Sequence, residues 1–172
     1  MGDAGKWACC NVGASAPWEY GGYYAWGETE EKDNYSVETY IHCNGSIETC
    51  HAIGDDIAGT EYDVAHVKWG DTWCLPSIEQ IKNLLNHSTS EWRTVNGIKG
   101  IKFTATNGKT IFLPAAAGYN SDDVGVLGYY WSSRQNPNEL YYAYSLNFNP
   151  TDSYWSNSNT RNYGFSVRPV TE

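Results

Sequence analysis

The chain has 172 residues, a length that fits one domain over residues 1–172, and 41% of them are hydrophobic, enough for one core. Its formal net charge of −9 argues against a nucleic-acid partner, because contact with phosphate backbones needs a basic surface. No run approaches the roughly 20 apolar residues of a membrane span, which argues against membrane insertion, and no apolar signal-peptide core is visible near the amino terminus.

The five cysteines are odd in number and sparse, which argues against a disulfide-rich scaffold. Cys43 and Cys50 are close enough in sequence to close a small disulfide loop in an oxidising compartment. Buried or unpaired thiols are the favoured interpretation. Because no Cys-x-x-Cys pair occurs and the four histidines are scattered, we expect no structural zinc and no cofactor.

The first third of the chain predicts little regular structure. Residues 23–26 are predicted to form a short aromatic strand after the turn at Gly21-Gly22, and residues 28–60 to form long loops. Residues 61–69 are expected to form a short helix, with Asp63 in its first turn and Thr60 as its cap.

The clearest helix begins after Ser77, where Ser77 and Gln80 form the pattern of a capping box. Its apolar residues recur at helical spacing and define a buried face: Ile78, Ile81, Leu84 and Leu85. A β-hairpin is predicted next, because alternating apolar residues at 101–105 lead into the turn Asn107-Gly108 and a return strand at 110–113.

Three further strands are predicted, at residues 129–133, 142–149 and 165–170. In the second of them, alternation places Tyr144, Leu146 and Phe148 inward and leaves Ser145, Asn147 and Asn149 facing water. Two helices followed by antiparallel strands, with long loops between them, indicate an α+β fold.

Residues 129–163 have a composition of their own. Tyr, Asn and Ser fill 20 of these 35 positions, and a polar, loop-rich rim would explain the Asn and Ser but not the Tyr. Tyr combined with Ser and Asn is typical of antibody binding loops, where Tyr supplies contact area and Ser and Asn supply adaptable hydrogen bonds. The segment is therefore predicted to be a binding face.

The codons of asparagine suggest how such a segment could arise. Replacing one adenine of AAC or AAT gives Tyr, Ser, Asp, Thr, His or Ile. Asn, Tyr, Ser, Asp and Thr recur through residues 129–163, as adenine-directed mutagenesis of Asn codons would leave them.

Several motifs carry a resemblance to known families. Three motifs resemble the variable region of diversity-generating retroelement variable proteins: GYYWSS (128–133), YAYSLNF (142–148) and GFSVRPV (164–170). Four further motifs resemble a bacterial paralogous surface-domain family: WACCNVG (7–13), GYYAWGET (22–29), WCLPS (73–77) and FLPAA (112–116). Together these motifs extend over nearly the whole chain.

The resemblance implies a C-type-lectin-like fold of the formylglycine-generating-enzyme subtype, with 129–163 as the variable ligand-binding region. It implies a receptor-binding protein of a bacterial surface or a phage virion, with an unidentified protein or cell-surface ligand. The positions that match the variable pattern are Tyr141, Tyr142, Ser145, Asn147, Asn149, Tyr154, Ser156, Asn157, Asn159, Asn162 and Tyr163. In this pattern Trp155 is the fixed anchor, and its neighbours lie on an exposed loop.

The chain departs from the enzymes and lectins of that fold. It has no cysteine after Cys74, whereas formylglycine-generating enzymes need a late cysteine pair, and it lacks the Glu-Pro-Asn and Trp-Asn-Asp motifs of calcium-dependent sugar binding. No catalytic residue and no metal ligand is therefore predicted.

Two other candidate sites are disfavoured. Asp63 could hydrogen-bond His66, and His66 could serve as the base for a Cys74 nucleophile, but Cys74 lies between Trp73 and Leu75 at an expected core edge and no oxyanion loop accompanies it. Asn120, Asp122 and Asp123 do not supply the six or more ligands of calcium, so a solvated acidic turn is expected there.

Two alternatives to a diversified binding protein stay open. One is a non-variable bacterial surface adhesin of the same fold that stacks glycans on its aromatic rings. The other is a purely structural virion or cell-wall protein with no ligand. The sequence does not reveal the oligomeric state.

Overall fold

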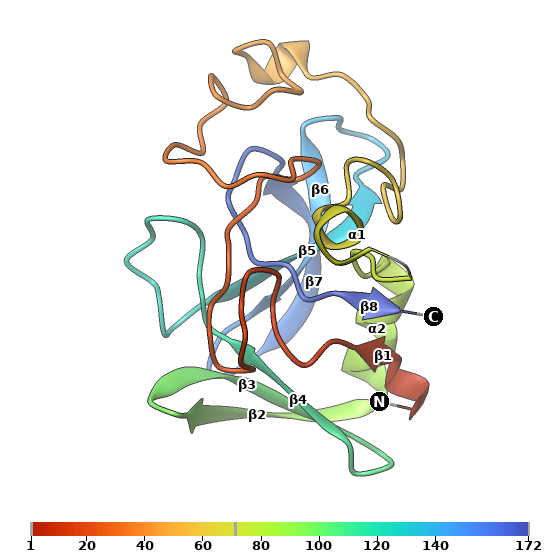
Figure 1. The fold of residues 1–172 in the computed structure, drawn as a ribbon, viewed down its shortest axis with the longest axis vertical. Coiled ribbons are helices and arrows are strands. Elements are labelled where there is room, and N and C mark those ends of the chain that lie inside the picture. Colours follow the sequence, from red (N-terminus) through yellow and green to blue (C-terminus); the bar gives the residue numbers. More distant parts are fainter. Residues whose placement is uncertain (1, 71, 172) are drawn as a thin grey trace.

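The computed structural model describes residues 2–70 and 72–171 and combines short helices with three antiparallel sheets, which confirms the α+β class. The sheets consist of β1 (Lys6–Trp7) with β8 (Val170–Thr171), of β2 (Ser88–Val95), β3 (Ile98–Ala105) and β4 (Thr110–Pro114), and of β5 (Gly128–Gln135), β6 (Tyr142–Phe148) and β7 (Ser153–Thr160). Long loops join these sheets (Figure 1). Within the described residues, no helix has both the length and the apolar character needed to cross a lipid bilayer.

Four helices accompany the sheets in the described residues: α1 (Val64–Trp69), α2 (Ile78–Asn86) and the 3-10 turns Gly2–Ala4 and Ile47–Thr49. The capping box of α2 is confirmed, since Gln80 N–H donates to the Ser77 hydroxyl and the Gln80 side chain accepts from Ser77 N–H. The predicted cap of α1 is wrong. Asp63, not Thr60, caps it, because the Asp63 carboxylate accepts the first free N–H groups, those of Ala65 and His66.

The predicted hairpin is confirmed as β3 and β4, which pair antiparallel around the Asn107-Gly108 turn. A third strand, β2, was not expected from the sequence. Its residues are mostly exposed and show no apolar alternation, and it forms because all eight of its residues pair with β3. Trp92 of β2 also packs edge-on against Phe148, at 6.3 Å between ring centroids.

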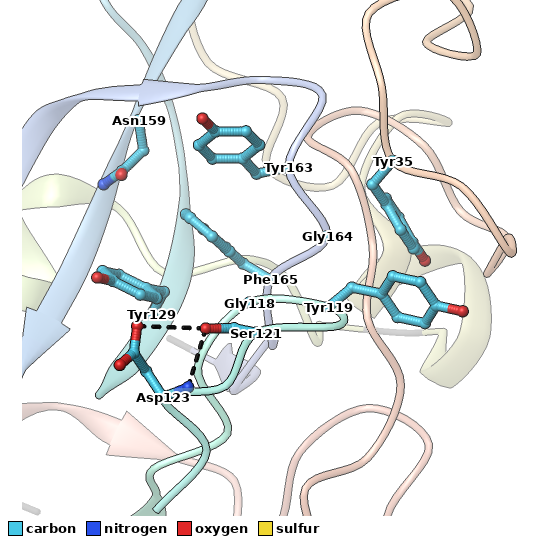
Figure 2. Close-up of a pocket in the computed structure, with 10 residues that line it drawn as sticks. All are labelled: Tyr35, Gly118, Tyr119, Ser121, Asp123, Tyr129, Asn159, Tyr163, Gly164 and Phe165. Carbon is cyan, nitrogen blue, oxygen red and sulfur yellow. Dashed lines mark hydrogen bonds between the residues drawn. The ribbon is translucent and has the colours of Figure 1, made fainter. Parts of the chain in front are cut away.

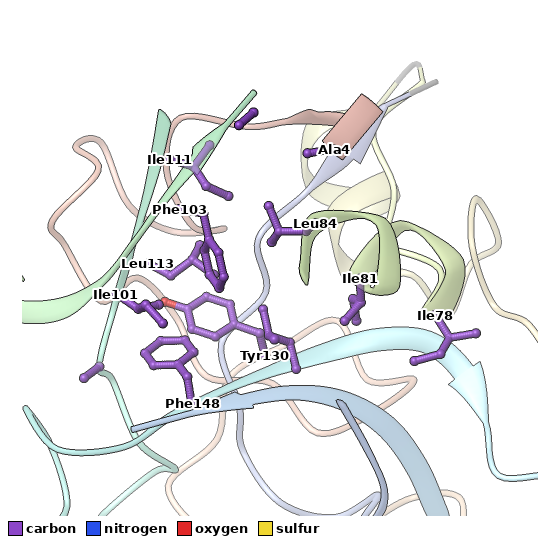
Figure 3. Packing of buried hydrophobic residues seen from close by; sticks show 13 residues of the cluster. Ala4, Ile78, Ile81, Leu84, Ile101, Phe103, Ile111, Leu113, Tyr130 and Phe148 are labelled. Carbon is purple, nitrogen blue, oxygen red and sulfur yellow. The ribbon is translucent and has the colours of Figure 1, made fainter. Parts of the chain in front are cut away.

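The sheet β5-β6-β7 lies between two hydrophobic cores. On its helix-side face, Tyr130, Leu146 and Phe148 pack against α2 and the β3-β4 hairpin (Figure 3). On its opposite, loop-side face, Trp131 and Ala143 pack against residues from the amino-terminal loops and the carboxyl-terminal segment. Both faces of the central sheet are therefore covered over much of its area.

Three sequence predictions about extended segments need correction. The residues around Trp155 form strand β7 and not a loop, because they pair with β6 from Tyr142 to Phe148. Residues 23–26 contribute only an isolated bridge, between Tyr24 and Phe165. In residues 165–170 Phe165 and Val167 are buried, but regular strand begins only at Val170.

The favoured interpretation of Cys43 and Cys50 as thiols is wrong, because they form a disulfide. The short turn at residues 44–49, which contains a 3-10 helix, brings the two cysteines into an isolated antiparallel bridge. That backbone contact places the two side chains together, which sequence spacing alone does not establish. The disulfide cross-links residues within the long loop of residues 28–60.

Two arginines are fully buried and bind backbone segments together. Arg168 donates to Asn11 Oδ1 at 2.8 Å, to the carbonyls of Ala8 and Cys9 at 3.2 and 3.0 Å, and to the Phe112 carbonyl at 2.9 Å. Arg161 donates to the Tyr40 hydroxyl and to the carbonyls of His51 and Leu140, and its guanidinium lies 4.8 Å from the centre of the Trp26 ring. Burial lowers the pKa of both guanidinium groups from its usual high value.

Candidate functional site

Five of the eleven predicted binding positions lie on the loop-side face of β5-β6-β7. Residues directly opposite each other on neighbouring strands project to the same side of a sheet. Tyr129, Asn147 and Tyr154 form one such row across the three strands. Ser145 and Ser156 are paired in the next row, and Asn159 is paired with Ala143 beyond it. Five positions that are scattered in sequence thus share one surface: Ser145, Asn147, Tyr154, Ser156 and Asn159.

Two of these positions are not displayed to water, contrary to the sequence prediction. Ser145 and Asn147 are 0% and 5% exposed, because the loop-side face of β6 is covered as well as its helix-side face. Their polar groups are satisfied within the sheet. The Ser145 hydroxyl donates to Asn147 Oδ1 at 2.7 Å, and the Asn159 amide donates to the Ser145 oxygen at 2.6 Å. Ser145 and Asn147 therefore form a fixed polar layer on β6, next to the more exposed Tyr154 of β7.

A cavity of about 360 Å³ opens beside this face (Figure 2). Its lining comes from four separate stretches of chain: Tyr35, Gly118, Tyr119, Ser121, Asp123, Tyr129, Asn159, Tyr163, Gly164 and Phe165. We call it the tyrosine pocket. Two of its residues, Asn159 and Tyr163, belong to the predicted set. Its volume lies in the range of small-ligand sites.

Aromatic rings form the walls of the tyrosine pocket. Tyr129 stacks on Phe165 with ring centroids 4.9 Å apart, and Tyr35 packs against Tyr119 at 4.8 Å. Tyr35 lies so close to Gly164 that an added Cβ there would approach the ring to 2.9 Å, so glycine is needed at that position. The Tyr35 hydroxyl donates to the Tyr23 carbonyl, which fixes the ring in place.

The charge of the tyrosine pocket is negative. Asp123 is its one charged side chain, and its carboxylate accepts a long hydrogen bond of 3.4 Å from the Ser121 hydroxyl. Burial raises the pKa of Tyr35 to about 12 and also raises that of Tyr129, where nearby Tyr154 and Asp123 add to the effect. The phenols are therefore neutral at physiological pH.

Other predicted positions serve the fold. Asn162 is buried, and not exposed as predicted, because its amide donates to the Tyr35 carbonyl at 2.9 Å. Asn149 Oδ1 accepts from the backbone N–H groups of Thr151 and Asp152 and shapes the β6-β7 turn.

The remaining predicted positions lie at the margins of the loop-side face. Tyr141 and Tyr142 are half-buried at the start of β6, and their ring centroids lie 4.6 Å apart. Asn157 is half-buried on β7, and its carbonyl accepts from the Asn136 amide. Trp155, the predicted anchor, projects to the helix-side face, where it is 41% exposed and lies near Tyr144 and Lys82.

Sequence reasoning missed much of the tyrosine pocket. Tyr35 and Tyr119 lie outside the unusual segment, in loops whose folding onto the sheet no local pattern predicts. Asp123 was considered only as a calcium ligand. Its loop is exposed, and within the described part of the chain no three His, Cys, Asp or Glu side chains gather into a metal-binding group.

The residues weighed for catalysis have structural contacts. Asp63 accepts from the backbone N–H groups of Gly59, His66 and Leu75 as well as Ala65, so its bond to His66 involves the backbone and not the imidazole. The Cys74 sulfur lies 3.7 Å from the Val170 carbonyl oxygen, in the bridge between these two residues.

No family model, curated protein or solved structure matches the chain.

Proposed function

We propose that the chain is a ligand-binding protein of C-type-lectin-like fold that presents a retroelement-diversified surface to a protein or cell-surface ligand. The observation that carries the proposal is the gathering of Tyr154, Ser156 and Asn159 on one sheet face beside the tyrosine pocket. In this proposal binding, and not catalysis, is the activity, exerted from a bacterial surface or a phage virion.

The chemistry of the face suits adaptable recognition. Tyr154 and Tyr163 are 45% and 47% exposed, so they offer large amphipathic area without contributing to either core. Ser156 and Asn159 supply short polar groups around them, as in antibody paratopes. Exchange of the exposed side chains would alter the ligand and leave Trp131, Leu146 and Phe148 of the cores in place.

Deep sequencing of the 3′ region of the gene in its source population tests the diversification. We expect substitutions confined to adenine-derived codons, concentrated at Tyr154, Ser156, Asn159 and Tyr163, and a second, Asn-rich copy of the codons for residues 129–163 near a reverse transcriptase gene. A uniform sequence, or changes spread evenly along the gene, would refute a retroelement-diversified face.

A second candidate is a non-variable surface adhesin that binds glycan. The aromatic walls of the tyrosine pocket favour it, since rings can stack on the apolar faces of sugars. The sequencing survey separates the two proposals, because an adhesin predicts constant codons at the positions that line the pocket. Binding of the protein to a glycan array would then support the adhesin.

A further inference from the structure

We propose that the tyrosine pocket binds an organic cation, a guanidinium or ammonium group carried by the ligand. The inference rests on the proposed function, because it names the chemical group that the binding site receives. It comes from the combination of aromatic walls with an unpaired carboxylate in one cavity.

The walls have the electronic character that attracts a cation. The face of an aromatic ring carries partial negative charge, and a cation within about 6 Å of the ring centre is stabilised by it. Four tyrosines and one phenylalanine line the pocket, from strand β5, the segment after β7, the 115–127 loop and the 28–60 loop (Figure 2). Because the phenols of Tyr35 and Tyr129 stay neutral at physiological pH, their rings keep this character.

A neighbouring contact illustrates the same attraction. The Lys32 ammonium lies 5.5 Å from the Tyr35 ring centre, although Lys32 does not line the tyrosine pocket. Lys32 is held there by an ion pair with Glu28 at 2.6 Å.

The fixed charge of the pocket has no counter-ion in the described chain. Asp123 lines the cavity, no Lys, Arg or His lines it, and none of the ion pairs among the described residues includes Asp123. Its one side-chain partner is the Ser121 hydroxyl. A cationic ligand group would supply the missing positive charge, and the net charge of −9 would assist its approach.

Several hydrogen-bond donors of the pocket are already used within the protein. The Asn159 amide donates to Ser145, the Tyr35 hydroxyl to Tyr23, and the Ser121 hydroxyl to Asp123. The strongest acceptor in the pocket is the Asp123 carboxylate, the kind of partner that the N–H groups of ammonium and guanidinium require.

The test is titration of the intact protein with small probes, followed by NMR of the backbone amides. N-acetyl-arginine amide, N-acetyl-lysine amide and tetramethylammonium carry the cation, N-acetyl-citrulline amide is the neutral counterpart of arginine, and methyl glucoside represents a sugar. We expect saturable shifts at residues 118–123, 129 and 163–165 with the cations, and weak or no shifts with the neutral probes. A tighter arginine probe identifies a guanidinium ligand, and a tighter lysine or tetramethylammonium probe an ammonium ligand.

Matched variants locate the effect in the pocket. Asp123→Asn should weaken cation binding by about fivefold, whereas Asp122→Asn, which removes the same charge outside the lining, should change it by less than about twofold. Tyr119→Leu should weaken it by roughly three- to tenfold, and Tyr119→Phe, which keeps the ring, should not. Circular dichroism of each variant verifies that it is folded.

Equal affinity for the arginine and citrulline probes, or no effect of Asp123→Asn, would overturn the cation assignment. Shifts in the pocket with methyl glucoside alone would assign it to a sugar instead. These outcomes are independent of the sequencing survey. If the gene is diversified but the protein binds none of the cations, the proposed function stands and only this inference fails. If the gene is uniform but the pocket binds cations, the diversified face fails and the cation assignment stands.

Discussion

Removal of the buried Arg168 guanidinium should cost much of the stability of the protein. Arg168→Met would leave three buried acceptors without this donor, Asn11 Oδ1 and the carbonyls of Ala8 and Phe112, together with the partly buried Cys9 carbonyl. Each buried group left unpaired costs about 1–3 kcal/mol, so the lower end of the sum over the three buried acceptors is about 3 kcal/mol. A typical domain is stable by about 5–15 kcal/mol, and the variant should therefore unfold at much lower urea concentration.

The assay is urea unfolding followed by tryptophan fluorescence, with Arg93→Met as the matched control. Arg93 pairs with Glu91 at 2.7 Å, but both side chains are more than half exposed, so the loss there should be at most about 1 kcal/mol. Arg168→Lys keeps the charge but lacks the forked guanidinium that reaches both residues 8–11 and Phe112, and its midpoint should lie between those of the two Met variants. If Arg168→Met and Arg93→Met shift the midpoint equally, the reasoning about buried acceptors is refuted.

Three further predictions concern the scaffold. Reduction of the Cys43–Cys50 disulfide should lower stability by about 2–3 kcal/mol through the entropy of its short loop, which thermal unfolding with and without reductant would measure; an unchanged midpoint would contradict it. Ser77→Ala should cost about 1 kcal/mol by removing the cap of α2, whereas Ser77→Asp should retain most of that stability. Burial raises the pKa of Tyr35 to about 12 and that of Tyr130 further, above the value near 10 of an unfolded tyrosine, so stability should be intact below pH 10 and fall as the pH rises beyond it. Urea unfolding at a series of pH values, with tyrosinate absorbance recorded alongside, would test this. A urea midpoint that stays constant as the pH rises above 10 would count against it.

Helix α2 and the β3-β4 hairpin could be predicted because their signals are local. A capping box and an Asn-Gly turn specify a boundary within a few residues, whatever the rest of the chain does. Strand β2 carries no such signal, since its polar residues become a strand only by pairing with β3. The position of β2 is therefore set by its pairing with β3 and not by the sequence of residues 88–95 alone.

The candidate site was predicted in composition but not in exposure. Alternation along β6 identifies which residues share a face, and it placed Ser145 and Asn147 together correctly. It assumes that one face meets water, an assumption that fails when loops fold over the second face. The burial of Arg161 and Arg168 escaped prediction for a related reason, since arginine is seldom buried and its partners here are distant carbonyls.

The pairing of β1 with β8 has a mechanical consequence. Lys6 is paired with Thr171 and Trp7 with Val170, so the two ends of the described chain leave the molecule side by side, away from the 115–127 loop (Figure 1). Tension applied through both ends would peel this two-residue ladder first, because force on adjacent strand ends separates their hydrogen bonds one at a time. The sheet β5-β6-β7, which borders the tyrosine pocket, is not part of this ladder, so its hydrogen bonds would be loaded only after the ladder has opened.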